Sequence, residues 1–156
     1  MSSYLTFYLV PKKSRTKYVR NEETNEIEEQ EVQLNQEPLS LMYYCRSSEI
    51  YQAFYENLHP AYAGKEDKYS ELTYRDTKYV CKQYEDTILR TKKRLDSLYK
   101  IIKEKYDPEL VDEIMSAEEY LSECKETLNV LENISRIVYE VTEGYGDFEK
   151  VLINID

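Results

Sequence analysis

Residues 90–137 read RTKKRLDSLYKIIKEKYDPELVDEIMSAEEYLSECKETLNVLENISRI, and this stretch changes its charge in the middle while its apolar spacing continues. Before Asp107 and Pro108 the apolar residues lie among Lys and Arg, and after this pair they lie among Glu and Asp. Asp is a favourable N-cap, Pro is favoured at the first helical position, and Pro disfavours helical geometry in the residue before it. The sequence therefore predicts two helices that meet at this pair.

Both predicted helices carry a stripe of apolar residues at alternating steps of three and four. Seven of ten stripe positions are apolar in the first helix and eight of ten in the second. This spacing is typical of helices that pack along a heptad seam, and folding back buries both stripes within one chain. We therefore expect a long antiparallel, coiled-coil-like helical hairpin within residues 66–143. The stripe positions are Tyr74, Thr77, Cys81, Tyr84, Ile88, Thr91, Leu95, Leu98, Ile102 and Lys105, followed by Leu110, Ile114, Ala117, Leu121, Cys124, Leu128, Leu131, Ser135, Val138 and Thr142.

The turn at Pro108 also predicts which residues face each other. Residues at equal distances from Pro108 in sequence should meet, such as Ile102 with Ile114. Residues 81–106 contain eight basic and four acidic residues, whereas residues 107–156 contain three basic and fourteen acidic ones. An exposed ion pair contributes about 0 to 1 kcal/mol and a buried Leu or Ile about 1.5 to 3 kcal/mol, so the seam should stabilise the hairpin and the charges should select its orientation. The expected ion pairs are Lys103 with Glu113, Lys93 with Glu123 and Arg90 with Glu126.

Three short segments have the aromatic and branched composition of β-strands, namely residues 3–10, 39–45 and 150–155. They can share one antiparallel or mixed sheet, whose face needs a helix against it. Residues 48–58 supply that helix, because Ser47 or Ser48 can cap it and apolar residues recur at four-residue steps. The predicted fold class is α+β: one elongated domain with a three-stranded base (residues 1–65 and 144–156) and a helical hairpin (residues 66–143).

Residues 12–37 form a charged excursion between the first two predicted strands. Their first part is basic and their second part acidic, with seven acidic and no basic residues in 21–37. Two interpretations stay open. The excursion is either a solvated loop or a projecting β-hairpin, in which cross-strand charge pairs would contribute only about 0.2 to 1 kcal/mol each.

The composition limits the possible partners and compartments. The net charge of −10 argues against direct binding to nucleic acid, and no apolar run is long enough for a membrane span or, at the N-terminus, for a secretory signal. The three cysteines, Cys45, Cys81 and Cys124, lack the spacing of a zinc site or a disulfide framework. We expect reduced thiols, a cytoplasmic location, no membrane partner and no cofactor or metal.

The residues that could take part in catalysis do not form a recognisable catalytic motif. His59, the one histidine, has no nucleophile or carboxylate placed near it by a local pattern, and we expect it in a loop. Gly144 and Gly146 follow a predicted helix and are interpreted as a C-cap and a turn rather than a phosphate loop. The basic RTKKRL segment is the weak candidate for a nucleic-acid contact, because its acidic partner helix neutralises it. We therefore expect a protein that is not an enzyme.

The tyrosines of the chain are the candidate contacts for another protein. The chain has seventeen tyrosines and no tryptophan, and tyrosine is enriched at protein interfaces. We expect an exposed patch formed by Tyr43, Tyr44, Tyr51, Tyr55 and Tyr62. The leading hypothesis is a protein-binding or assembly module that binds another protein or itself, as a structural subunit or inhibitor encoded by a phage or mobile element and acting in the host cytoplasm.

An alternative hypothesis assigns the function to the acidic half of the helical hairpin. Its carboxylates would mimic the phosphates of a nucleic acid and bind a DNA-handling protein. The residues of this acidic face are Glu118, Glu119, Glu123 and Glu126.

Overall fold

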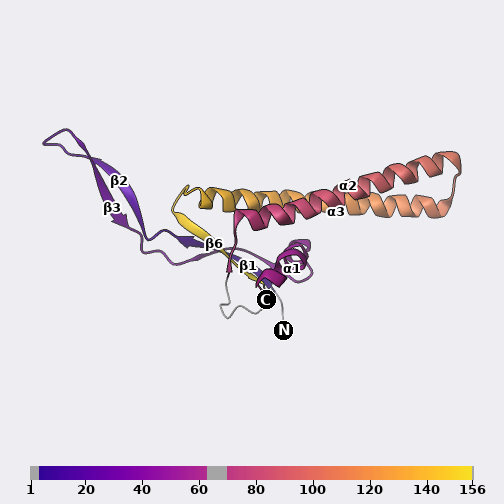
Figure 1. The fold of residues 1–156 in the computed structure, drawn as a ribbon, viewed down its shortest axis with the longest axis horizontal. Helices are drawn as coiled ribbons and strands as arrows, with labels where there is room; N and C mark the ends of the chain where they lie inside the picture. Colours follow the sequence, from indigo (N-terminus) through magenta and orange to yellow (C-terminus); the bar gives the residue numbers. More distant parts are fainter. Residues whose placement is uncertain (1–3, 63–69, 156) are drawn as a thin grey trace.

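The protein folds into an α+β body with two projections, a long helical hairpin and a separate β-hairpin (Figure 1). The computed structural model describes residues 4–62 and 70–155, without the side chains of residues 41–43 and 59–62. The predicted α+β class and helical hairpin are confirmed. The elements are β1 (Tyr4–Pro11), β2 (Ser14–Arg20), β3 (Ile27–Gln33), β4 (Leu39–Cys45), α1 (Glu49–Tyr62), β5 (Ser70–Glu71), α2 (Tyr74–Glu104), α3 (Pro108–Thr142) and β6 (Phe148–Ile155).

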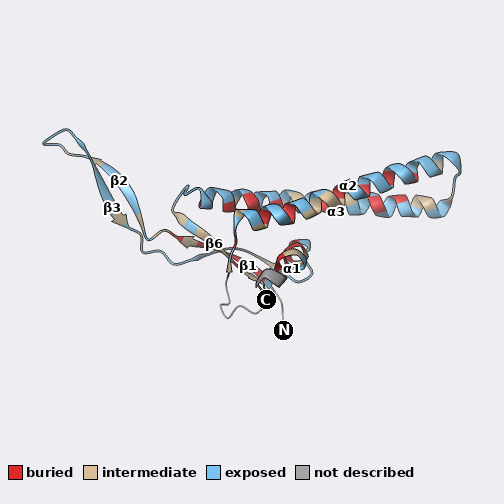
Figure 2. Ribbon diagram, in the orientation of Figure 1, coloured by how far each residue is buried: buried red, intermediate tan, exposed pale blue. Residues whose placement is uncertain are grey.

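Helices α2 and α3 begin at strong local signals. The Thr73 side chain accepts a hydrogen bond from the backbone N–H of Asp76, and the Asp76 carboxylate accepts one from the backbone N–H of Thr73. At the start of α3, the Asp107 carboxylate accepts a hydrogen bond from the Glu109 N–H at 3.0 Å. The chain therefore reverses at Asp107 and Pro108 as predicted, and buried residues follow the seam between the two helices (Figure 2).

The register of the helical hairpin differs from the predicted one by about one helical turn. The hydroxyls of Thr77 and Ser135 lie 3.0 Å apart inside the seam. Farther out, Leu95, Leu98, Ile114 and Ala117 form one buried cluster. These residues are equidistant in sequence from position 106 rather than from Pro108, because α2 ends at Glu104 and α3 begins at Pro108. The centre of the connecting segment, and not the proline, sets the register.

The predicted ion pairs across the helical hairpin are wrong, as follows from this shift. Lys103 with Glu113, Lys93 with Glu123 and Arg90 with Glu126 do not pair within the described residues. Glu113 instead accepts a hydrogen bond from Arg94 at 2.8 Å. The apolar seam is therefore what specifies the packing of the two helices, and most of their charges remain in solvent.

The main sheet is antiparallel and has the strand order β4-β1-β6-β5. It has four strands and not three, because β5 contributes two residues, too few to produce a periodic sequence signal. Leu5 and Phe7 of β1 and Val151 and Ile153 of β6 are buried on one face. The same cluster contains residues of α1, α2 and α3, so the helices cover this face.

Helix α1 fills the space beside the helical hairpin. The Ile50 N–H donates to the Ser48 hydroxyl at 3.2 Å, and the Phe54 ring packs edge-on against Phe7 at 5.3 Å between ring centroids. The helix extends through residue 62 rather than ending at Leu58. A repeat of buried residues marks the packed part of a helix and not its backbone end, and the helical backbone continues past Leu58.

Candidate protein-binding surface

The excursion of residues 12–37 contains an antiparallel β-hairpin, which projects from the body at the end opposite to the α2–α3 turn (Figure 1). Ser14–Arg20 pair with Ile27–Gln33 without a break in register. None of these residues is buried, and Tyr18 and Ile27 are 66% and 73% exposed. Of the two interpretations, the hairpin is the one that the structure adopts.

The tip of the β-hairpin is held by local polar contacts. The Asn21 side-chain oxygen accepts a hydrogen bond from the Glu23 N–H at 2.9 Å, and its amide donates to Glu28 at 2.8 Å. Asn25 has a positive φ of 61°, a conformation that asparagine tolerates better than most residues. The turn residues therefore fit the backbone that the reversal requires.

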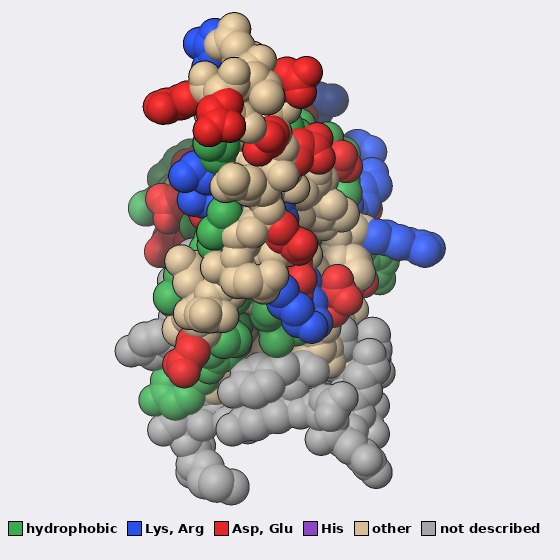
Figure 3. All heavy atoms as spheres, turned by 90° about the vertical axis from the view of Figure 1, so that its left-hand side faces the viewer, with side chains coloured by type: hydrophobic (Ala, Val, Ile, Leu, Met, Phe, Trp, Pro, Cys, Tyr) green, Lys and Arg blue, Asp and Glu red, His purple; other side chains and the backbone are tan. Residues whose placement is uncertain are grey.

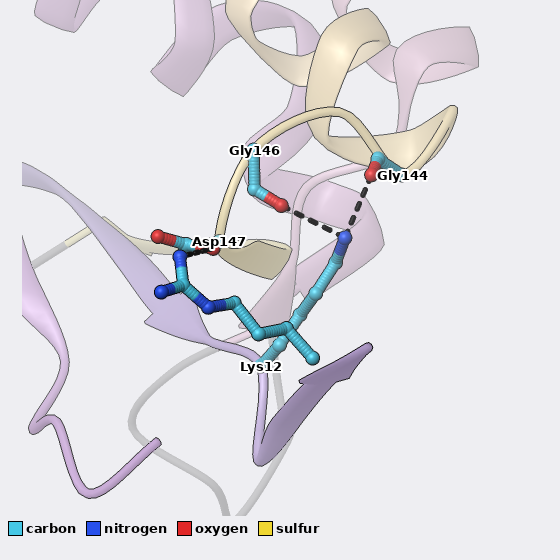
Figure 4. A network of polar contacts seen from close by, with 5 residues as sticks. Lys12, Gly144, Gly146 and Asp147 are labelled. Atoms are coloured by element: carbon cyan, nitrogen blue, oxygen red, sulfur yellow. Dashed lines mark hydrogen bonds and ion pairs between the residues drawn. The ribbon is translucent and has the colours of Figure 1, made fainter. Parts of the chain in front are cut away.

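The root of the β-hairpin is attached to the end of α3 (Figure 4). The Lys12 ammonium donates to the carbonyls of Gly144 and Gly146 at 2.7 and 2.8 Å, and the Lys12 N–H donates to the Asp147 carbonyl at 2.8 Å. Arg15 lies 3.7 Å from the Asp147 carboxylate. Because α3 has no basic residue in its last turn, Lys12 supplies the positive charge that a helix C-terminus favours.

Helix α3 ends as predicted. Gly144 and Gly146 have φ values of 84° and 73°. The Tyr145 N–H donates to the Glu140 carbonyl and the Gly144 N–H to the Val141 carbonyl, which is the Schellman pattern. The glycines are therefore a helix stop and a turn, and they also present the carbonyls that hold Lys12.

The charges of the β-hairpin are not neutralised across its two strands. Lys17 lies opposite Gln30, and Arg20 lies opposite Ile27. On the other strand, Glu29 lies opposite Tyr18 and Glu31 opposite Thr16. In the part of the chain that the structure describes, none of these four charged residues forms an ion pair. Figure 3 views this end of the molecule, where acidic and basic side chains both face the solvent.

The five predicted interface tyrosines do not share one environment. Tyr51 is buried, at 2% exposure, so the prediction that it is exposed is wrong; it follows the core residue Ile50 on the packed face of α1. Tyr44 is half-buried against the core, and burial raises its pKa. Tyr55 is exposed, and its ring stacks on Tyr51 at 5.7 Å. The side chains of Tyr43 and Tyr62 lie outside the described residues. A binding role for these tyrosines stays a prediction.

The acidic face lies along the distal half of α3. Glu118, Glu119, Glu123 and Glu126 are all exposed. The Tyr99 hydroxyl donates to the Glu118 carboxylate at 2.5 Å, and this hydrogen bond raises the pKa of Tyr99. The face therefore offers solvated carboxylates to a basic partner.

The described cysteines differ in burial and in pKa. Cys81 and Cys124 are buried small residues of the seam, and burial raises the pKa of Cys81 to about 11. Cys45 is exposed, and a hydrogen bond with Ser47 lowers its pKa. The backbone of His59 is helical rather than in the predicted loop, and its side chain lies outside the described residues. Within the described ranges, His, Cys, Asp and Glu form no group suited to a metal ion.

Comparison of the chain with protein-family models, with curated proteins and with solved structures found no match. Among the helices of the described residues, none combines the length and the apolar character that crossing a membrane requires. The β-hairpin is the projection whose strands have no buried residue, so its surface is the candidate for binding.

Proposed function

We propose that this chain is a non-enzymatic protein-binding or assembly module, and that the β2–β3 hairpin is its binding element. The observation that carries the proposal is the exposure of the hairpin on both faces, without one buried residue in either strand. An isolated two-stranded hairpin is marginally stable in water, so its seven-residue pairing gains most from a partner that adds a strand or covers a face.

The polar character of the hairpin favours a protein partner. Tyr18 and Arg20 lie on the same face of β2, because alternate residues of a strand share a face. Ile27 lies opposite Arg20, so Tyr18 and Ile27 provide apolar contact area on one face of the hairpin. Around them lie both signs of charge, which is the composition of a polar, steered protein interface rather than of a small-molecule pocket. A role as a structural subunit or inhibitor of a phage or mobile element belongs to the same proposal and depends on the identity of the partner.

A photo-crosslinking experiment tests this function. A benzophenone amino acid replaces Tyr18 in one variant and Leu89 in a matched control, since Leu89 is 55% exposed on α2. After irradiation in cells of the source organism, the Tyr18 variant should form covalent adducts with a protein and the Leu89 variant should not. Adducts of the same kind from both positions, or none from the Tyr18 variant, would contradict the proposal.

The acidic face supports a second candidate, a nucleic-acid mimic that binds a DNA-handling protein. Its support is that Glu119, Glu123 and Glu126 are exposed and form no ion pair within the described residues. The 35 residues of α3 span about 52 Å at 1.5 Å per residue, a rod along which charges can be spaced. Replacing the four glutamates of this face with glutamine should abolish salt-sensitive binding to such a protein. Unchanged binding would dismiss this candidate.

A further inference from the structure

The β2–β3 hairpin has two free edges in the described structure, because it is a sheet of only two strands. The Asn21 N–H donates to the Glu26 carbonyl and the Leu34 N–H to the Lys13 carbonyl, which fixes the alternation of inward and outward amides. In this alternation, the amides of Thr16, Tyr18 and Arg20 point away from β3. Those of Glu29 and Glu31 point away from β2. Each outer edge therefore offers a row of backbone groups to a further strand.

The two free edges have opposite charge. Strand β2 carries Arg15, Lys17 and Arg20 and no acidic residue, whereas β3 carries three glutamates and no basic residue. A symmetric dimer would place β2 against β2 or β3 against β3, and like charges on neighbouring strands are destabilising. Placing β3 of one molecule against β2 of the next brings opposite charges together. Because Lys17, Arg20, Glu29 and Glu31 lie opposite uncharged residues within one hairpin, they remain available for this contact.

We propose that the hairpin binds a second copy of this chain head to tail, with the acidic outer edge of β3 pairing antiparallel with the basic outer edge of β2. This inference rests on the proposed function and names its partner. The pairing continues one antiparallel sheet through successive molecules. Because the contact is heterologous, it leaves one free edge of each kind at the ends, and further copies add to them.

The bodies of successive molecules can fit around such a sheet. Each copy adds two strands, a step of about 10 Å, which is narrower than two packed helices. The twist between strands is about 20 to 25°, so neighbouring copies are rotated by about 40 to 50° around the axis of the growing sheet. The hairpin projects away from the body (Figure 1). The rotation therefore places the bodies of neighbouring copies in different directions around the axis of the sheet.

The test measures mass in solution and exploits the opposite charges. Light scattering on the purified full-length protein, from about 5 µM to about 500 µM, should show a weight-average mass that at least doubles. The increase should shrink as NaCl rises from about 0.05 to about 0.5 M, because exposed charges are screened. A monomeric mass at every concentration would overturn the inference.

Charge-reversal variants separate edge pairing from other association. Lys17→Glu/Arg20→Glu makes both edges acidic, and Glu29→Lys/Glu31→Lys makes both basic, so each variant alone should stay monomeric. Mixed together they should associate, and the variant with all four changes should associate by itself. Lys92→Glu/Lys93→Glu on the exposed side of α2 is the matched control and should behave as wild type. A mixture that stays monomeric, or single variants that still associate, would contradict head-to-tail pairing.

The outcomes also distinguish this inference from the proposed function. A strictly monomeric chain whose Tyr18 position crosslinks to a different protein would refute self-association and keep the binding function. A chain that assembles through its hairpin supports both. Association that persists in all charge variants would refute the edge pairing, whatever the crosslinks show.

Discussion

Lys12 joins the two projections of the molecule at a single residue. Its ammonium reaches the Gly144 and Gly146 carbonyls, where α3 ends and the chain turns into β6 (Figure 4). The same residue precedes β2, so one side chain caps a helix and fixes the base of the β-hairpin. Helix C-termini favour positive charge, and hydrogen bonds to charged groups are stronger than neutral ones.

Replacing Lys12 should therefore destabilise the protein. Lys12→Ala removes two charge-assisted hydrogen bonds and should lower the free energy of unfolding by about 1 to 2 kcal/mol. Urea denaturation followed by circular dichroism measures this change. Lys13→Ala is the control, because Lys13 is exposed and its side chain makes no hydrogen bond with the residues that the structure describes. It should change stability by less than about 0.5 kcal/mol. Equal effects of the two substitutions would contradict the capping role of Lys12.

The thiols should differ in reactivity. Cys45 is exposed and its pKa is lowered, whereas Cys81 and Cys124 are buried with raised pKa values. At pH 8, a disulfide reagent should titrate one thiol quickly and the other two only after unfolding. Rapid reaction of all three in the native protein would show that the seam is open.

Alkaline pH should weaken the fold through Cys81. Its pKa rises from 9.0 to about 11 on burial, because burial disfavours the thiolate. The associated stability is fully present below about pH 9 and is lost as pH rises toward 11, since the unfolded state ionises first. Denaturation curves between pH 8 and pH 11 should show this loss, and it should be smaller in Cys81→Ala.

At the scale of elements, the seam is divided into two buried clusters. Leu131 belongs to the larger one, where α2 and α3 meet the sheet and α1, and is 1% exposed. Leu98 belongs to the smaller distal cluster and is 8% exposed. Among the described residues, the packing partners of the distal cluster come only from the two helices. The helical hairpin is therefore held more firmly at its base than at its tip.

Replacing these two leucines with alanine should show that the base of the helical hairpin contributes more to stability than its tip. Leu131→Ala should cost about 3 to 4 kcal/mol and Leu98→Ala about 2 to 3 kcal/mol, because the residue with more buried neighbours leaves the larger cavity. Leu89→Ala, at an exposed position of α2, is the control and should cost less than about 0.5 kcal/mol. Chemical denaturation measures all three. A larger cost at Leu98 than at Leu131 would contradict the order.

The sequence predicted the elements better than their mutual placement. The stripe from Tyr74 to Val138 is long and periodic, and Pro108 is an unambiguous helix start, so both helices could be located. The register between the two helices could not be predicted, because two heptad stripes pack equally well after one helix shifts by one turn along the other. The charges could not decide it either, since exposed ion pairs contribute too little. Strand β5 is too short for any period to detect.

The β2–β3 hairpin was less predictable than the rest of the fold. The charge blocks in residues 12–37 are compatible with both a loop and a hairpin. The pairing of Ser14 with Gln33 depends on a turn that no short sequence motif predicts. The tyrosine count predicts Tyr51 at the surface, because it contains no information on which side of α1 faces the sheet. The periodic signal of Ile50 and Phe54 was compatible with a buried neighbour at position 51 as well.

At the scale of the whole molecule, the β-hairpin is separate from the core. No residue of its two strands is buried, and the core cluster of the body contains none of them (Figure 2). Its attachment consists of the contacts around Lys12 and Asp147. The body should therefore fold without the hairpin strands.

Deleting residues 14–33 tests this independence. Replacing them with Asn-Gly between Lys13 and Leu34 retains the last backbone hydrogen bond of the hairpin, at 2.9 Å, and supplies a favourable two-residue turn. The melting temperature should change by less than about 5 °C, because little more than the exposed Arg15–Asp147 ion pair is lost. Loss of cooperative unfolding would contradict the separation of body and hairpin.

Amide hydrogen exchange by NMR tests the central claim, that the free edges of the hairpin bind a strand. In dilute protein, the outward amides of Thr16, Tyr18, Arg20, Glu29 and Glu31 should exchange rapidly, while the inward amides of Val19 and Gln30 should be slower. At concentrations where the mass increases, the outward amides should become protected by at least about tenfold, because they then donate to a neighbouring strand. Unchanged exchange of the outward amides in the associated protein would contradict the claim.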